Sequence, residues 1–140
     1  MSRRGVGLVV ALGALTVAAW LVVASARVRE DVPGEFAGKR NPLGGAVAVA
    51  AGARIFHESC ASCHGDEADG RGPAAGGLVP PPANFASGPI LGRHSDAYLY
   101  WRISAGKPGT AMPSFHGVLG ETERWQVVGY LRSLAVSARR

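Results

Sequence analysis

The sequence predicts an all-α fold of about three to five helices, preceded by one N-terminal transmembrane helix. Three observations support this prediction. Apolar residues recur at helical spacing within residues 46–61, 95–105 and 121–137. No segment sustains the alternation of apolar and polar residues that is typical of strands. An uncharged apolar run, Val6–Ala26, covers 21 residues near the N-terminus.

This apolar run is long enough to cross a membrane, since 21 residues span roughly 30 Å as a helix. Secretory signal peptides have shorter apolar regions, of about 7–15 residues. We therefore expect residues 1–26 to form an uncleaved membrane anchor. The small residues Ala24-Ser25-Ala26 are compatible with signal cleavage, which stays the alternative.

Residues 27–44 mix charged residues with Pro and Gly, which predicts a linker between the anchor and a domain of residues 45–140. The linker and the anchor flanks carry most of the chain's excess positive charge. The whole chain has 15 Lys and Arg against 10 Asp and Glu, whereas nine basic residues face seven acidic ones from Gly45 onward. No basic run is interleaved with aromatic residues, so nucleic acid is not an expected partner.

The first helix of the domain is predicted over residues 46–61, which are rich in alanine. Gly52 interrupts it, and an interior glycine costs about 1 kcal/mol relative to alanine. Such a glycine is expected where another helix crosses closely, with Ile55 and Phe56 supplying apolar bulk one turn later.

The end of this helix carries the pentapeptide Cys60-Ala61-Ser62-Cys63-His64, the pattern of a covalent attachment site for c-type haem. Residues three and four apart share one face of a helix. Cys60 and Cys63 are therefore placed to bond one porphyrin, while the imidazole of His64 ligates the iron. The sequence predicts one haem c, bound by these three residues.

Other sites built from two cysteines fit this sequence less well. A redox-active dithiol normally opens a helix in a βαβ context, and no strand is predicted before Cys60. A structural zinc site needs further ligands, yet the chain holds no second cysteine pair. A disulfide between Cys60 and Cys63 would close a very short, strained loop.

Residues Gly65–Gly92 are predicted to form a long loop, because they contain seven glycines and five prolines. A haem makes such a loop reasonable, since the loop can wrap around the ligand. After it, Ser95 is the expected N-cap of a helix that reaches Ala105. A last helix is expected from Glu121 to about Ser137.

A sixth iron ligand is expected if the protein only carries electrons, and Met112 is the main candidate. It lies 48 residues after His64, between Gly106, which ends a helix, and Pro113, which prevents another. His116 is the second candidate and His94 the third, while His57 is expected to be a solvated helix residue. Methionine ligation raises the reduction potential of a haem.

Gly52…Phe56, Cys60–Gly65, Met112-Pro113 and Trp125…Tyr130-Leu131 together resemble a class I monohaem cytochrome c. The resemblance covers residues 45–135. It implies a cytochrome c-like fold around one haem, and a backbone carbonyl between Pro73 and Pro82 that accepts the Nδ1–H of His64. The long loop makes the chain similar to bacterial cytochrome modules attached to respiratory or dehydrogenase complexes.

The predicted function is single-electron transfer by a membrane-anchored cytochrome c, in a respiratory or dehydrogenase-linked chain. C-type haems are attached outside the bacterial cytoplasm, so we expect a single pass through the inner membrane with the domain on the periplasmic side. The expected partners are redox proteins or a membrane respiratory complex. We expect no catalytic residues and no small-molecule substrate.

Two alternatives belong to other classes of function. If Met112 did not ligate the iron, an open axial position would suit an enzyme or a gas sensor. The haem could also serve only to stabilise a structural subunit of a larger complex.

Overall fold

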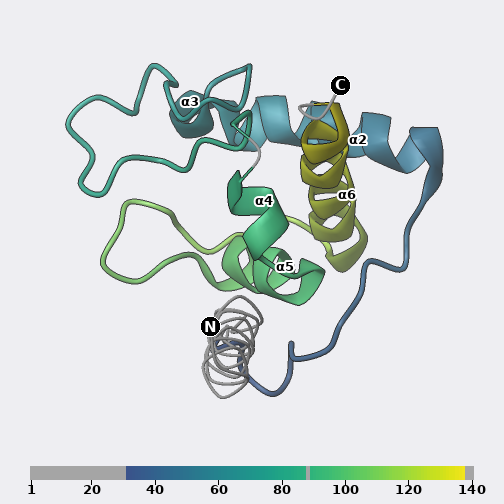
Figure 1. The fold of residues 1–140 in the computed structure, drawn as a ribbon. Helices are drawn as coiled ribbons and strands as arrows, with labels where there is room; N and C mark the ends of the chain where they lie inside the picture. The colour runs from purple at the N-terminus through teal and green to yellow at the C-terminus, as the bar shows by residue number, and fades with distance from the viewer. Residues whose placement is uncertain (1–30, 88, 138–140) are drawn as a thin grey trace, which may run out of the picture.

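The computed structural model describes residues 31–87 and 89–137 (Figure 1), and this part of the chain contains helices and no strands. The predicted all-α fold is therefore confirmed for the domain. The five helices of the described part are α2 (Gly45–Ser59), α3 (Ala61–His64), α4 (Pro89–Arg93), α5 (Asp96–Ala105) and α6 (Glu121–Ser137).

The predicted membrane anchor, Val6–Ala26, lies outside the described residues. Among the helices of residues 31–87 and 89–137, none is long and apolar enough to cross a membrane. The anchor therefore stays a prediction.

Helices α2 and α6 cross at Gly52, as expected from the sequence (Figure 1). A Cβ atom at this position would collide with the main-chain carbonyl of Gln126, and it would lie 3.1 Å from Cβ of Tyr130. Phe56, one turn after Gly52, packs its ring 5.2 Å from the ring of Tyr130. Glycine is required at residue 52 because the two helix backbones touch there.

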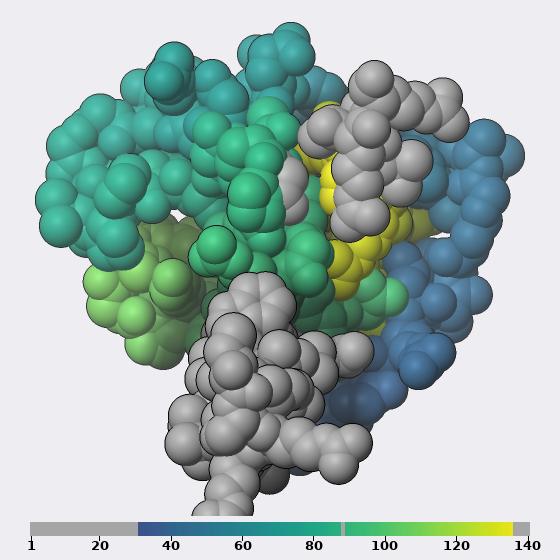
Figure 2. Space-filling model, viewed as in Figure 1, coloured from purple at the N-terminus to yellow at the C-terminus, as the bar shows by residue number. Residues whose placement is uncertain are grey.

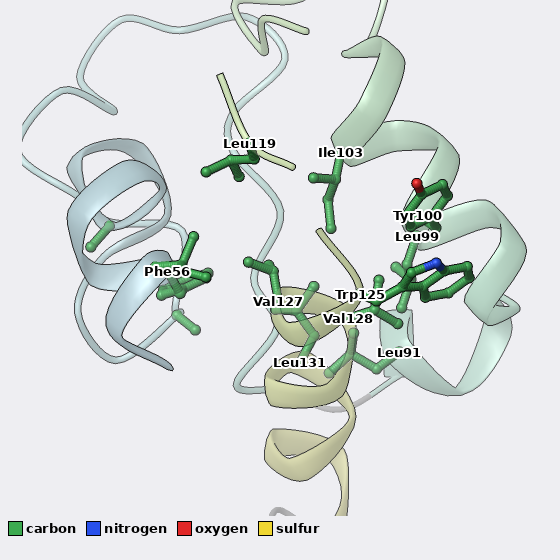
Figure 3. Packing of buried hydrophobic residues seen from close by; sticks show 13 residues of the cluster. Phe56, Leu91, Leu99, Tyr100, Ile103, Leu119, Trp125, Val127, Val128 and Leu131 are labelled. Carbon is green, nitrogen blue, oxygen red and sulfur yellow. The ribbon is translucent and has the colours of Figure 1, made fainter. Parts of the chain in front are cut away.

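The apolar core lies between α2, α5 and α6 (Figure 3). Its most deeply buried large side chains are Phe56, Leu91, Val127 and Val128. Helix α5 begins as predicted, since Oγ of Ser95 accepts the amide of Tyr98 at 3.1 Å. The end of α5 at Gly106 and the bounds of α6 also agree with the sequence prediction.

Two predicted boundaries are wrong. The first helix does not run on into the cysteine motif: it ends at Ser59, because Cys60 leaves the helical region with φ of −122°. The predicted loop Gly65–Gly92 also contains the start of α4, at Pro89. Proline at the first position of a helix costs no hydrogen bond, so Pro89 was a usable signal for this helix.

Residues 33–43 pack against the domain. Phe36 and Leu43 contact the core cluster. Asn41 donates from Nδ2 to the carbonyl of Trp125 at 2.9 Å and from its amide to Asp96 at 3.1 Å. This half of the predicted linker is therefore held against α5 and α6.

Candidate functional site

The two cysteines and His64 lie within five consecutive residues, α3 and its N-cap Cys60. The amide of Cys60 donates to the carbonyl of Phe56 at 2.8 Å, and the amide of His64 donates to the carbonyl of Cys60 at 2.9 Å. Both thiols are free of a disulfide, and both residues are partly exposed. The predicted haem-attaching residues are thus adjacent, within α3 and its N-cap.

The loop that follows α3 turns back and satisfies the carbonyl groups at the end of this helix. Helix ends normally leave their last four carbonyls without a helical partner. Here the four bonds run from Gly65 to Ala61, Ala74 to Ser62, Gly72 to Cys63 and Gly70 to His64, at 2.7–3.1 Å. Gly72 approaches so closely that a Cβ atom would collide with the carbonyls of Ala61 and Ser62. The loop backbone therefore clamps the segment that carries both cysteines.

His64 is oriented by the next part of the same loop. Its Nδ1 donates to the carbonyl of Ala83 at 3.1 Å, and the ring of Phe85 stacks on it at 4.9 Å. A hydrogen bond at Nδ1 fixes the tautomer in which Nε2 carries the lone pair, the form that binds a metal. The acceptor was expected between Pro73 and Pro82, and lies one residue beyond that range.

The pKa shifts of His64 and Cys60 both favour the uncharged form of the side chain. Burial lowers the pKa of His64 below its ordinary value, although the hydrogen bond to Ala83 acts in the opposite direction. The imidazole is therefore neutral at pH 7, as a metal ligand must be. Burial raises the pKa of Cys60 to about 11, and the nearby Cys63 adds to this shift. Redox-active cysteines instead have lowered pKa values, which disfavours the dithiol alternative.

Among residues 31–87 and 89–137, no group of three or more His, Cys, Asp or Glu side chains is arranged to hold a metal ion.

Met112 lies in a tightly closed turn that follows α5. The carbonyl of Met112 accepts the amide of Lys107 at 3.2 Å. Oγ1 of Thr110 donates to the carbonyl of Lys107 at 2.8 Å and accepts the amide of Met112 at 3.2 Å. Gly106, with φ of +72°, leads into the turn, and a Cβ atom there would press on the backbone of Met112 and Pro113. Met112 itself is partly buried.

The residues after Met112 fasten this loop to the end of α5. The amide of Phe115 donates to the carbonyl of Ile103 at 3.1 Å. The carbonyl of Ser104 accepts two bonds, from the amide of His116 at 3.2 Å and from Oγ of Ser114 at 2.6 Å. The Met112 loop therefore caps the C-terminal end of α5, as the loop after α3 caps α3.

Arg124 connects this loop to α6, and sequence reasoning missed it. Its side chain is only 6% exposed. It donates to the hydroxyl of Tyr100 at 2.9 Å and to the carbonyl of His116 at 3.4 Å. The ring of Tyr100 in turn stacks on Trp125 at 4.0 Å. The sequence signal for this role was the position of Arg124 on the same helix face as Val127 and Val128.

The loop after α3 and the loop after α5 lie on the same side of the molecule (Figure 1). Figure 2 shows a hollow between them, with residues of the first loop in teal above it and residues of the second in light green below. Of the predicted axial ligands, His64 is the last residue of α3, directly before the first loop, and Met112 lies in the second loop. His57 is exposed and pairs with Asp66 at 3.1 Å, His94 stacks on Tyr98, and His116 is exposed.

The residues present fit a haem that carries carboxylate groups. The thiols lack a disulfide, and the imidazole offers one nitrogen. Within the described part of the chain, buried Nε of Arg102 and buried Nε of Arg124 have no hydrogen-bond partner. Each of these guanidinium groups therefore keeps one donor that a carboxylate group of a ligand can accept.

Comparison with known proteins finds a matching family and similar proteins. A family model described as cytochrome c oxidase, cbb3-type, subunit III matches residues 47–131. Thiosulfate dehydrogenase of Stutzerimonas stutzeri (strain A1501) is 29% identical over 129 residues, which cover 87% of this chain and 39% of that protein. A chain of the reducing HAO-like protein complex of Kuenenia stuttgartiensis is 32% identical, with a TM-score of 0.57 over 66% of this chain and 46% of that one. The chain thus spans less than half the length of both relatives.

Proposed function

The chain belongs to the family of cbb3-type cytochrome c oxidase subunit III, and from this premise we propose that it is a membrane-anchored monohaem electron carrier. A cytochrome c domain implies covalently bound haem c with its iron. We propose that Cys60 and Cys63 bond this single haem and that His64 and Met112 ligate its iron. The haem, when bound, supplies reversible one-electron chemistry at iron.

One observation carries this proposal: Nδ1 of His64 is held by the carbonyl of Ala83, on a helix whose cap holds a free thiol. This bond leaves Nε2 of a neutral imidazole as the ligating atom. The clamp on α3 keeps both thiols and the imidazole in one fixed arrangement. A rigid ligand set favours electron transfer, because little has to move when the charge of the site changes.

The surrounding residues exclude water and position the second ligand. Ile55 and Phe56 are at most 2% exposed, and the ring of Phe56 lies 6.4 Å from that of His64, so the interior beside α3 is apolar. The turn closed by Lys107 and Thr110 holds Met112 on the loop that faces the hollow. Apolar surroundings and a thioether ligand both favour the reduced state of a haem iron.

The membrane anchor and the location follow from the sequence. We propose that residues 1–26 span the inner membrane once, that residues 27–44 connect the anchor, and that residues 45–140 form a cytochrome domain on the periplasmic side. Extraction of the full-length chain from membranes by detergent, but not by high salt, is the expected result. Release by salt alone would contradict the anchor.

Redox proteins, or a membrane respiratory complex, are the proposed partners. Thiosulfate dehydrogenase and the matched chain of the reducing HAO-like complex are both longer than this chain. We propose that this chain is an electron-transfer subunit or carrier and does not itself act on a small substrate.

Met112→Ala tests the ligand set. We expect loss of the charge-transfer band between methionine and ferric iron, together with a lower reduction potential, because the thioether ligand is gone. His116→Ala is the matched control, since His116 is the second candidate and is exposed. If His116→Ala removes the native ligation and Met112→Ala does not, the proposed ligand set is wrong.

Carbon monoxide binding tests the open-site alternative. The reduced wild-type protein should bind carbon monoxide slowly and weakly, because Met112 occupies the sixth position. Fast and tight binding would instead indicate an enzyme or a gas sensor.

A further inference from the structure

The two loops that flank the hollow are uncharged over long stretches. Residues 72–92 and residues 108–120 contain no Asp, Glu, Lys or Arg. Elsewhere in the domain charged residues are frequent, since the segment from Gly45 to Arg140 holds nine basic and seven acidic side chains. In the rest of the domain and its linker, a charge-free stretch of similar length occurs at residues 41–53, which lead into α2 and form its first two turns.

The same two loops expose large apolar side chains. Among the described residues, the strongly exposed large apolar side chains are Val79 at 88%, Val118 at 72% and Val47 at 87%. Val79 lies in the loop after α3 and Val118 in the loop after α5. Val47 lies in the first turn of α2, at the end of the molecule opposite the two loops (Figure 1).

Two of the acidic residues that follow the haem motif interact with α2 and α6. Asp66 pairs with His57 of α2 at 3.1 Å. Glu67 lies close enough to Tyr130 of α6 to raise the pKa of its hydroxyl, an effect second to that of burial. Oδ1 of Asp69 accepts the amide of Arg71 at 2.9 Å. These contacts leave the stretches 72–87 and 108–120 as an uncharged rim on either side of the hollow.

We propose that this rim is the docking face for the redox partner, and that the partner is a redox protein whose own docking face is apolar and uncharged. The proposal rests on the proposed function, because it assumes electron exchange at the site between the loops. Burial of Val79 and Val118 would stabilise the encounter.

The charge pattern selects this class of partner. A charged partner face would lose hydration against the rim without gaining an opposite charge, which is unfavourable. Long-range steering between opposite charges raises association rates, and an uncharged rim provides none. Docking through this face should therefore depend little on ionic strength.

The protein itself is a suitable probe, because its own rim is an apolar, uncharged face. In a mixture of reduced and oxidised copies, one electron leaves a reduced copy and enters an oxidised copy, so the mixture keeps its composition. NMR line broadening gives the rate of this self-exchange. We expect a rate that changes less than about two-fold between 0.01 M and 1 M ionic strength, where the Debye length falls from about 30 Å to about 3 Å.

Charged substitutions in the rim sharpen the test. Val79→Lys, Val118→Lys and Val118→Glu should each slow self-exchange roughly two- to five-fold at 0.01 M ionic strength, and high salt should restore the rate. Both signs of charge act alike here, because two copies carry the same new charge. Val47→Lys is the matched control, with the same residue type and similar exposure; it should leave the rate unchanged.

The outcomes separate this proposal from the proposed function. Suppose that the wild-type protein keeps methionine ligation and its reduction potential, but Val79→Lys and Val118→Lys exchange electrons as fast as Val47→Lys. The proposed docking face is then wrong, and the proposed function as an electron carrier is unaffected. A self-exchange rate that rises with salt in the wild-type protein would also overturn the uncharged rim. Loss of methionine ligation or of reversible reduction in the wild-type protein would overturn the proposed function itself.

Discussion

The two loops beside the hollow use the same backbone scheme but hold their proposed ligands differently. Each turns back onto the carbonyl groups that end a helix, α3 in one case and α5 in the other. His64 belongs to the clamped helix itself, and a carbonyl of the loop binds its ring. Met112 belongs to the loop, six residues beyond Gly106. His64 is thus held both by α3 and by the loop bonded to the end of α3, whereas Met112 is held by its own loop alone.

The largest effect is expected from Gly72→Ala, which attacks the clamp on α3. The added Cβ would collide with the carbonyls of Ala61 and Ser62, so the loop would have to move away from the haem motif. We expect the free energy of unfolding to fall by about 3 kcal/mol, as in an overpacked interior. Denaturant unfolding of the haem-loaded protein measures this.

Gly76→Ala is the matched control, because a Cβ atom at Gly76 has no neighbour within 4 Å. If both variants were equally stable, the close approach of Gly72 would not be what holds α3.

Arg124→Met should weaken the loop that carries Met112 without weakening the loop after α3. The change removes the bonds to Tyr100 and to the carbonyl of His116, and a bond from a charged donor contributes about 2 kcal/mol. We expect the methionine charge-transfer band to disappear at a lower temperature, while His64 stays bound to the iron. Optical and resonance Raman spectra, recorded against temperature, distinguish the two ligands.

Arg54→Met serves as the control, since Arg54 is exposed and pairs with Glu58 on its own helix. Equal loss of both axial ligands in Arg124→Met would contradict the difference between the two loops.

A smaller effect is expected from Thr110→Val, which removes two hydrogen bonds within the Met112 turn while keeping its shape. We expect a local loss of about 1 kcal/mol, which corresponds to roughly five-fold faster hydrogen exchange at the amide of Met112. The amides of Gly70 and Gly72, which belong to the other loop, should exchange at their wild-type rates. Faster exchange in both loops would show that they open as one unit.

The sequence predicted the features that depend on local chemistry. Ser95 as a cap and Gly106 as a stop each act within one helical turn, so the ends of α5 could be found without the fold. Gly52 was informative because an interior glycine is unfavourable unless another backbone lies against it. The adjacency of Cys60, Cys63 and His64 follows from their spacing alone.

Features that depend on distant parts of the chain could not be predicted. The break at Cys60 separates α2 from α3, whose last carbonyls are bound by residues 70–74 later in the chain. The choice of Ala83 as the acceptor depends on how the loop is tied to the carbonyl of Ala68, which binds the amides of Phe85 and Ala86. The role of Arg124 needs the contact between α6 and the loop after α5, which no local pattern encodes.

The clamp on α3 is built from main-chain amides, and this has a consequence for how such a protein diversifies. Apart from the glycines that approach other backbone closely, such bonds do not depend on side-chain identity, so the outer part of the loop can change its residues while the ligand set stays in place. Gly76 marks this permissive part, because an added Cβ there meets nothing within 4 Å. Insertions at this point are tolerated by a surface loop. New partners can therefore be acquired, or an affinity tag grafted, by rewriting a few residues there.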